Sequence, residues 1–412
     1  MSRVQAGDPQ AGQLTGQGIN LALATWTFAI NFWAWNLIGP LSATYTKDMS
    51  LSSSQTALLV ATPILVGSVG RIPIGALTDR YGGRVMFAVI SLISIAPVLL
   101  VAFAGSIDSY ALLLVFGFFL GIAGTTFAIG IPFAKAWYEP SRRGFATGVF
   151  GAGMGGTALS AFFTPRFVIW FGYFPAHIII AVALALTALL VWMRMSDSPA
   201  WQPNTGAVLP KLAAAGKLAI TWQMSFLYAV AFGGFVAFST YLPTYLKTIY
   251  DFSLTDAGAR TAGFAIAAVI ARPIGGVLSD KIHPKIVVMV SLAGTAVMGA
   301  LVVLQPAPEI AAGATFIAMA FFLGIGTGGV FAWVALSAPP DRVGTVTGIV
   351  GAAGGLGGFF PPLVMGATYD SADNDYTTGL VLLSLVGLVA LLYTAWRLPG
   401  RSRAPVKSTA TK

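Results

Sequence analysis

The stretch GRIPIGALTDRYGGR at residues 70–84 has a counterpart in the second half of the chain, ARPIGGVLSDKIHPK at residues 271–285. The two stretches align Arg71 with Arg272, 201 residues further on, and each arginine stands in the middle of a long apolar segment. A charged side chain at the centre of a bilayer costs about 2.5–3.5 kcal/mol on insertion scales, so it indicates a function. Two such cations at matching positions predict a site for an anion.

The composition places the chain in a membrane. Hydrophobic residues make up 56% of the chain and charged residues 9%, and the mean hydropathy is +0.81, whereas a soluble domain averages roughly 25% charged residues. Apolar runs long enough to cross a hydrocarbon core of about 30 Å recur along the sequence. We expect an all-α membrane protein with twelve transmembrane helices in two pseudo-symmetric six-helix bundles. The expected spans are 20–41, 57–78, 85–104, 109–136, 145–165, 174–195, 221–242, 260–279, 286–304, 311–335, 345–366 and 378–397.

A second internal repeat supports a duplicated architecture. RGFATGVFGAG, which begins at Arg143, matches VGTVTGIVGAA, which begins at Val343, at an offset of 200 residues. Duplicated halves are typical of transporters that bind their substrate at mid-membrane between the halves. A polar connection rich in proline and glycine separates the two halves. We therefore predict an N-terminal bundle at 1–195, a cytoplasmic linker at 196–219, and a C-terminal bundle with a short tail at 220–412.

The distribution of lysine and arginine predicts the orientation. On the expected map sixteen basic residues fall on the side of the linker and four on the other side. Because basic loops stay on the cytoplasmic side, we expect a multi-pass protein of the plasma membrane with both termini in the cytoplasm. This topology explains the net charge of +9 without a nucleic-acid partner. We expect the lipid bilayer as the surroundings of the protein and a monomer as its assembly.

Three basic residues remain within the expected spans: Arg71, Lys135 and Arg272. Lys135 lies near the cytoplasmic end of the fourth span, where its ammonium can snorkel toward the interface. The two arginines lie mid-span, where snorkelling is difficult. All fourteen acidic residues fall in tails, loops or helix ends on this map. The sequence therefore predicts a cationic membrane interior.

Two glycine tracts occupy matching places in the halves, GVFGAGMGG at 148–156 and GIVGAAGGLGG at 348–358. Small residues let membrane helices approach closely and slide. Close packing alone would explain one such tract, whereas two matched tracts predict helices that repack as the halves move. The candidate conformational glycines are Gly148, Gly151, Gly153, Gly155, Gly351, Gly354, Gly355 and Gly357.

These motifs carry a resemblance that covers nearly the whole chain. The signature loop of the major facilitator superfamily, between its second and third helices, is similar to Gly75, Asp79, Arg80, Gly82, Gly83 and Arg84, with a degenerate copy at Gly276, Asp280 and Lys281. The arginine pair and the glycine tracts resemble the nitrate/nitrite porter family. The resemblance implies a transporter of nitrate and nitrite that works by alternating access, without a cofactor or a metal.

The resemblance also implies which residues bind the anion. Arg71 lies thirteen residues before Arg84, as the family's substrate arginine does before its GGR. Carried over residue by residue, the binding set is Arg71, Arg272, Phe127, Tyr228, Phe232 and, with a looser alignment, Phe32. The chemistry agrees, because nitrate and nitrite are flat anions with acceptor oxygens only and a guanidinium is a flat fork of donors.

Two further features follow from the resemblance. Many family members have an asparagine in the glycine tract of the fifth span, where this chain reads Met154, Gly155 and Gly156, so a polar contact to the substrate is expected to be missing or supplied by another residue. Charged residues on the cytoplasmic side are expected to latch the outward-open state. This predicted gate consists of Asp79, Arg80, Arg84, Glu139 and Arg143.

The expected mode of transport is exchange of nitrate for nitrite, because an empty site would hold two uncompensated buried charges in the closed intermediate. Proton-coupled symport is an alternative, and so is a porter for another small anion such as cyanate. A passive anion channel would conduct the anion without a second anion on the opposite side of the membrane, and it would show no counterflow. An enzyme is not expected, since the sequence has no cysteine, no clustered histidine and carboxylate set, and no GxxxxGK phosphate loop.

Overall fold

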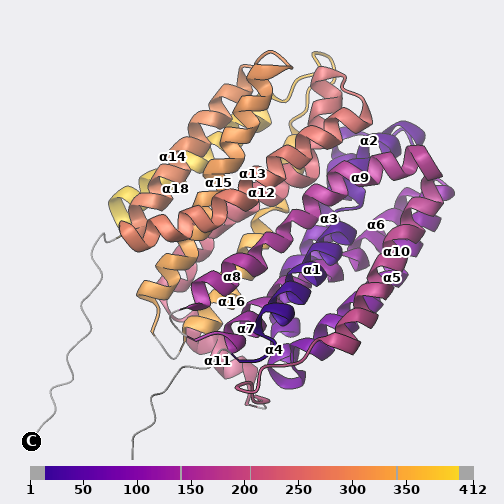
Figure 1. Cartoon of the computed structure of the whole chain (residues 1–412). Coiled ribbons are helices and arrows are strands. Elements are labelled where there is room, and N and C mark those ends of the chain that lie inside the picture. The colour runs from indigo at the N-terminus through magenta and orange to yellow at the C-terminus, as the bar shows by residue number, and fades with distance from the viewer. Residues whose placement is uncertain (1–13, 140–141, 205, 340–341, 399–412) are drawn as a thin grey trace, which may run out of the picture.

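The computed structural model describes residues 14–139, 142–204, 206–339 and 342–398. These residues form helices joined by short connections, and Figure 1 shows them gathered in two groups, the earlier helices in indigo and magenta and the later ones in orange and yellow. The first bundle consists of α1 (Gln17–Trp35), α2 (Ile38–Asp48), α3 (Ser53–Val69), α4 (Arg71–Tyr81), α5 (Gly83–Ser106), α6 (Tyr110–Leu120), η1 (Gly121–Thr125), α7 (Thr126–Trp137), α8 (Arg143–Gly151), η3 (Ala152–Gly155), α9 (Gly156–Phe171) and α10 (Tyr173–Arg194).

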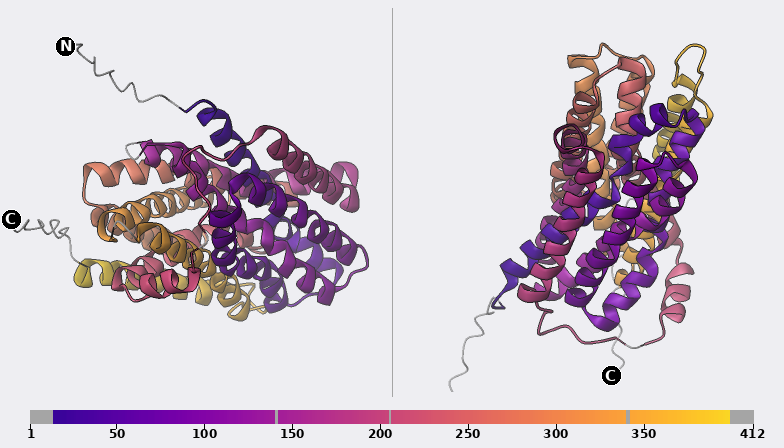
Figure 2. Two further views of the ribbon diagram at one scale, coloured as in Figure 1. Left: turned by 90° about the horizontal axis from the view of Figure 1, so that it is seen from below. Right: turned by 90° about the vertical axis from the view of Figure 1, so that its right-hand side faces the viewer.

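The second bundle follows a short linker helix, α11 (Val208–Gly216). Figure 2 shows α11 at the lower end of the molecule, the end at which α1 begins, and this end is called the linker face below. The second bundle consists of α12 (Ala219–Tyr250), α13 (Leu254–Lys281), α14 (Pro284–Val303), α15 (Ile310–Ser337), α16 (Val343–Gly357), α17 (Phe360–Ala367) and α18 (Thr377–Arg397).

Eleven helical stretches in the described residues are long and apolar enough to cross a membrane, one fewer than the twelve expected. The remaining expected span, 145–165, is helical but divided into α8, η3 and α9. Its middle is the tract GAGMGG at 151–156, and glycine both lowers the hydropathy and weakens regular helix. The helix is also interrupted at the second glycine tract, because α16 ends at Gly357 and α17 begins three residues later, just before Pro361.

Burial distinguishes inner helices from helices that face lipid. In the apolar 18-residue stretches of Gln17–Asp48 and Ala219–Tyr250, 78% and 72% of the residues are buried, whereas in those of α14 and α18 the share is 28%. The exposed side chains of α14 and α18 are large and apolar, for example Val297 and Val389. Such a surface suits a hydrocarbon environment, so α1 and α12 form the centre and α14 and α18 the rim.

The glycine-rich loop after α4 is held from the linker. The carboxylate of Asp197 accepts hydrogen bonds from the backbone N–H groups of Gly83 (2.7 Å) and Arg84 (3.2 Å), which are free donors at the start of α5. Gly82 has a φ of 86°, and a Cβ there would lie 2.5 Å from Asp197 Oδ2. Only glycine satisfies both the backbone conformation and this close approach.

Candidate functional site

Arg71 is the first residue of α4, directly after the end of α3. Its side chain is 3% exposed, and Nη1 donates a hydrogen bond of 2.6 Å to the carbonyl of Gly351 in α16. Nε and Nη2 are buried and have no partner among the described residues. Arg71 therefore keeps unused donors in the interior, and its one hydrogen bond crosses from the first bundle to the second.

Arg272 lies within α13 and is 8% exposed. Its Nη1 contacts the sulfur of Met154 in η3, and its Nε would lie 3.5 Å from a Cβ built on Gly151. This contact crosses from the second bundle to the first, opposite in sense to that of Arg71. A thioether is a weak acceptor, so the contact leaves the charge of Arg272 uncompensated.

Phe127 of α7 lies against both arginines. The Cζ atoms of Arg71 and Arg272 are 4.7 Å and 5.6 Å from the centroid of its ring. Phe232 of α12 is 5.4 Å from Arg71 Cζ, and Phe331 of α15 is 5.5 Å from Arg272 Cζ. Aromatic faces attract guanidinium groups, which helps to hold the two cations in place. The structure thus gathers the two predicted arginines around the predicted Phe127.

Tyr228 of α12 stands beside this cluster. Its ring stacks on Phe232 with centroids 5.0 Å apart and planes 1° apart, and it lies 4.5 Å from the ring of Phe331. Its hydroxyl is buried without a hydrogen-bond partner in the described part of the chain. An unsatisfied buried hydroxyl costs about 1–3 kcal/mol, so this group is a donor that a ligand could use.

Phe32 of α1 is buried but lies one ring further away. It packs on Phe28, with centroids 4.2 Å apart, and on Trp35, with centroids 4.7 Å apart. Phe28 makes the contact to Phe127, at 5.8 Å between centroids. The two phenylalanines are four residues apart and share a face of α1, so the sequence pattern alone did not distinguish them.

Several of the predicted glycines allow close approach around this cluster. A Cβ on Gly354 would lie 2.0 Å from Cδ1 of Tyr228, and one on Gly355 would lie 2.5 Å from Oγ of Ser68. A Cβ on Gly351 would lie 3.3 Å from the ring of Phe127. These positions of α16 admit no larger side chain without movement of the ring or hydroxyl that they face.

The other predicted glycines divide into two kinds. Gly153 and Gly357 are tight, since a Cβ would lie 2.5 Å from Phe28 and 2.4 Å from a backbone carbonyl of α12, respectively. Gly148 has one neighbour at 4.0 Å, and Gly155 has none within 4 Å. A role of these glycines in conformational change stays a prediction.

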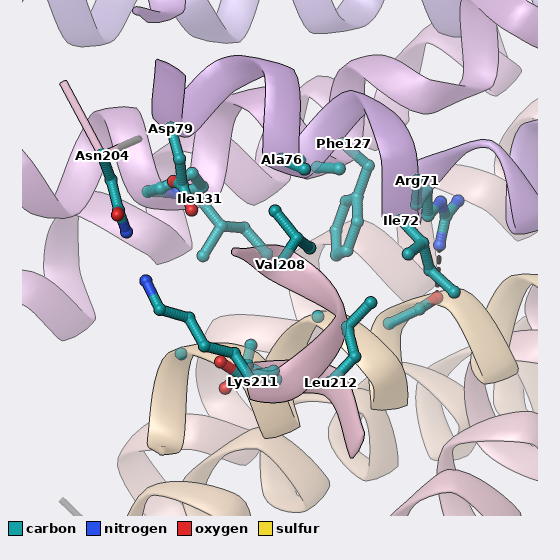
Figure 3. A pocket seen from close by; sticks show the side chains of 18 of the residues that line it. Arg71, Ile72, Ala76, Asp79, Phe127, Ile131, Asn204, Val208, Lys211 and Leu212 are labelled. Carbon is teal, nitrogen blue, oxygen red and sulfur yellow. Dashed lines mark hydrogen bonds between the residues drawn. The ribbon is translucent and has the colours of Figure 1, made fainter. Parts of the chain in front are cut away.

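A cavity of about 410 Å³ runs from Arg71 toward the linker face. Figure 3 shows Arg71 and Phe127 at one end and Asp79, Asn204 and Lys211 at the other. Its walls come from α4, α7, α16 and the linker. Arg272, Tyr228 and Phe232 lie outside this lining; they are the buried backing of its inner end.

The two bundles contact each other directly on the face opposite the linker. The hydroxyls of Ser42 and Thr244 are 2.6 Å apart, and Ser54 donates a hydrogen bond of 3.2 Å to the carbonyl of Gly366. Each pair joins the first bundle to the second. The structure is therefore closed on that face and hollow toward the linker face.

The predicted gate residues do not pair with one another in this state. Asp79 lines the cavity, and Glu139 is exposed. Arg84 donates to the carbonyl of Trp192 at 2.5 Å, and Arg143 donates to that of Tyr138 at 3.2 Å. Arg80 stands over the ring of its neighbour Tyr81.

Among the residues that the structure describes, the one ion pair is Lys247–Asp251, at the far end of α12 from the linker. A latch for a state closed at the linker face would be open in a state that is hollow there. The gate therefore stays a prediction.

Sequence reasoning missed four groups at the site: Phe28, Phe331, the carbonyl of Gly351 and the sulfur of Met154. Phe331 had a usable signal, because GTTFA at 124–128 and GTGGVFA at 326–332 both follow a glycine and threonine with a phenylalanine and alanine. The carbonyl of Gly351 had none, since every residue carries a carbonyl. Met154 marked a departure from the family pattern, and the structure places its sulfur on Arg272.

Known proteins resemble this chain along most of its length. A family model described as Major Facilitator Superfamily matches residues 24–362 and 224–412. The "Probable nitrate/nitrite transporter NarK2" of Mycobacterium tuberculosis is 63% identical over 399 residues, which cover 97% of this chain and 100% of that protein. The "Nitrite extrusion protein" of Bacillus subtilis is 35% identical over 385 residues, which cover 92% and 94% of the two chains.

A solved structure shares the fold. The inward-facing, occupied form of a bacterial homologue of the human lysosomal transporter Spinster superposes with a TM-score of 0.68. The superposition covers 93% of this chain and 96% of that one, at 18% sequence identity. At that identity the likeness concerns the arrangement of the helices alone.

Proposed function

Since the chain belongs to the Major Facilitator Superfamily and, within it, to the nitrate/nitrite porters, we propose that it carries nitrate and nitrite across the plasma membrane by alternating access. The substrate site in this proposal is the cluster of Arg71, Arg272, Phe127, Tyr228 and Phe232. The names of the relatives support the substrate, and the geometry of the cluster supports the site.

The observation that carries the proposal is a set of unused donors. Nε and Nη2 of Arg71 and the hydroxyl of Tyr228 are buried and have no partner in the described residues. Among the described residues, Arg272 contacts the thioether of Met154 and lies close to the hydroxyl of Tyr228, and both of these partners are neutral. Buried donors without acceptors are costly, and an anion with acceptor oxygens would satisfy them. Nitrate and nitrite have acceptor oxygens and no donors, which suits a site that lacks acceptor side chains.

The aromatic rings give the site its shape. Phe127, Phe232 and Phe331 surround the guanidinium groups at 4.7–5.6 Å from ring centroid to Cζ. A flat anion can lie against such rings while its edge faces the arginine forks. A tetrahedral or strongly hydrated anion would lose hydration that the apolar rings do not replace. The arrangement therefore favours a small planar anion.

Exchange follows from the state of the empty site. The partners of the two arginines, the Gly351 carbonyl and the Met154 sulfur, are neutral and belong in each case to the other bundle. They solvate the cations without neutralising them, and rocking of the bundles would break both contacts. A bound anion supplies charge that moves with the site, so the loaded carrier should change state faster than the empty one. We infer that nitrate entry is coupled to nitrite exit.

The structure corresponds to an inward-open state if the linker face is cytoplasmic, as the distribution of basic residues indicates. The bundle limits 1–195 and 220–412, with the linker at 196–219, are part of the same proposal. A transport role without catalysis, a monomeric assembly and both termini in the cytoplasm complete it.

Proton-coupled symport is the second candidate, and one observation favours it. Asp79 is a carboxylate that lines the cavity, so it can meet protons from the linker face. It lies eight residues, or about 12 Å of helix, from Arg71. That separation places it at the mouth of the cavity and weakens any coupling to the anion.

Anion uptake by purified protein in liposomes tests the substrate. Uptake of labelled nitrate into nitrite-loaded vesicles should be reduced by external nitrite and unlabelled nitrate, and only weakly by chloride, which is not planar, or by sulfate, which is tetrahedral and strongly hydrated. Cyanate is the informative competitor, because it is small and linear. Stronger inhibition by cyanate than by nitrite would replace the proposed substrate with another small anion.

A further inference from the structure

Lys135 is a partly buried cation that the proposed site does not use. It lies near the end of α7, and its side chain is only partly exposed. Its ammonium makes no hydrogen bond or ion pair with any residue in the described ranges. It lines the same cavity as Arg71. Snorkelling to the interface would explain its position, but a cation that opens into a substrate cavity is also available to a ligand.

Residues on one face of α7 line the cavity at regular intervals as far as Lys135. Phe127, Ile131 and Lys135 succeed one another every four residues on α7 and all line the cavity. Lys135 is therefore two helical turns from Phe127, or about 12 Å along the axis. An anion at Lys135 would be well separated from one at Arg71, and both would lie in one continuous space.

The opposite wall is polar and open at this level. It carries Thr345 and Thr347 of α16, whose hydroxyls can donate hydrogen bonds. Gly344 and Gly348 also line the cavity, and a Cβ on either would meet nothing within 4 Å. The space between α7 and α16 can therefore hold a small polyatomic ion.

The charges of the cavity favour an anion there. Its described lining carries three cations, Arg71, Lys135 and Lys211, against one carboxylate, Asp79. Lys211 extends from α11 toward Asp79 and Asn204 at the mouth (Figure 3). Asp79 interacts electrostatically with Lys211, whereas the charged side chain that acts on Lys135 is the cation Arg143. Lys135 is therefore, like Arg71, a cation of the cavity lining on which no carboxylate of the described residues acts.

We propose that Lys135 forms a second anion site, between the linker face and Arg71, that holds nitrate or nitrite on its way to and from the central cluster. This site rests on the proposed function, since it takes the same small oxyanions. An ammonium is a compact charge with three rotatable donors, and it lacks the planar fork of a guanidinium. The second site is therefore weaker and less selective than the central one, as a transfer site must be if the anion is to leave it.

The site predicts an asymmetric kinetic defect. In Lys135→Met the KM for anion presented at the linker face should rise about fivefold to tenfold, because a cation in a cavity raises the local anion concentration. The KM at the opposite face should stay unchanged, since that face has no access to Lys135 in the step that binds substrate. The difference should shrink when ionic strength is raised with an impermeant salt.

The experiment uses inside-out and right-side-out membrane vesicles from a host without its own nitrate transporter. The chain has no cysteine, so a single cysteine placed at the exposed linker residue Ala200 identifies the linker face by its reaction with an impermeant thiol reagent. Lys135→Arg should retain the wild-type KM values. Lys217→Met is the matched control, since Lys217 is an exposed linker lysine outside the cavity lining.

The outcomes separate the two proposals. Wild-type exchange of nitrate with an unchanged KM at both faces in Lys135→Met overturns the second site and leaves the proposed function standing. The same rise in KM in Lys217→Met also overturns it, because general surface charge then explains the effect. A wild-type protein that exchanges no nitrate overturns the proposed function and the second site with it.

Discussion

Replacement of Arg71 by lysine tests the geometry of the proposed site while it keeps the charge. The guanidinium donates to Gly351 through Nη1 and keeps Nε and Nη2 free for the anion. Lysine retains one point charge but loses the planar pair of donors. Loss of one charge-assisted hydrogen bond costs about 1.5–3 kcal/mol. Because 1.36 kcal/mol corresponds to tenfold, kcat/KM for nitrate should fall about tenfold to 150-fold.

The assay is initial uptake of nitrate into nitrite-loaded liposomes over a range of nitrate concentrations. Arg166→Lys is the matched control, because Arg166 of α9 donates to its own helix at the Phe162 carbonyl and lies outside the cavity lining. It should transport like the wild type. If Arg71→Lys keeps kcat/KM within twofold of the wild type, Arg71 does not bind the anion through a fork and the proposed site is wrong.

Three further predictions concern packing, the aromatic shell and the linker. Gly354→Ala should destabilise the protein by about 1–3 kcal/mol, because its Cβ would lie 2.0 Å from the ring of Tyr228, which is itself packed on Phe232. Gly155→Ala is the control and should have the melting temperature of the wild type, since its Cβ would meet nothing within 4 Å. Equal melting temperatures for the two variants would contradict this packing. Phe331→Leu should weaken nitrate binding by about 0.5–2 kcal/mol, because the cation–π contact with Arg272 is lost. Phe360→Leu is the control, since Phe360 is exposed. An unchanged KM for nitrate in Phe331→Leu would remove Phe331 from the site. Burial raises the pKa of the Asp197 carboxyl in the folded protein, in spite of its two backbone hydrogen bonds. The folded protein therefore keeps this proton at a pH where the unfolded chain, with a pKa of about 3.9, has lost it. The carboxyl stabilises the fold below the unfolded pKa, and this contribution is lost as the pH rises through the pKa of the folded state. Asp197→Asn should therefore gain melting temperature relative to the wild type as the pH rises above the unfolded pKa of about 3.9, and a difference that does not change with pH would contradict this expectation.

The sequence predicted the helical bundles and the arginine pair because both leave strong local signals. A mid-span arginine is rare, and its recurrence 201 residues later marked the repeat. The structure then brought Arg71 and Arg272 to one phenylalanine, Phe127. The fifth expected span, 145–165, is helical as α8, η3 and α9, but it is not among the eleven stretches that are long and apolar enough to cross a membrane.

Contacts between the bundles were beyond sequence reasoning for physical reasons. The acceptor of the Arg71 hydrogen bond is a backbone carbonyl, which no residue type identifies. The ring of α1 beside Phe127 is Phe28 and not Phe32, because the rotation of α1 about its axis decides which of its turns faces the centre. The state of the transporter also leaves no trace in the sequence. In the proposed alternating access, the pairing of Ser42 with Thr244 and the cavity at Asp79 belong to one of two arrangements of the same helices.

In the proposed mechanism, two uncompensated arginines make the empty carrier change state slowly and the loaded carrier change state fast. Nitrate uptake by liposomes loaded with nitrite, compared with anion-free liposomes, each with and without an inward proton gradient, measures this directly. We expect uptake that requires internal nitrite and does not respond to the proton gradient. Proton-driven uptake of nitrate into anion-free liposomes would contradict it.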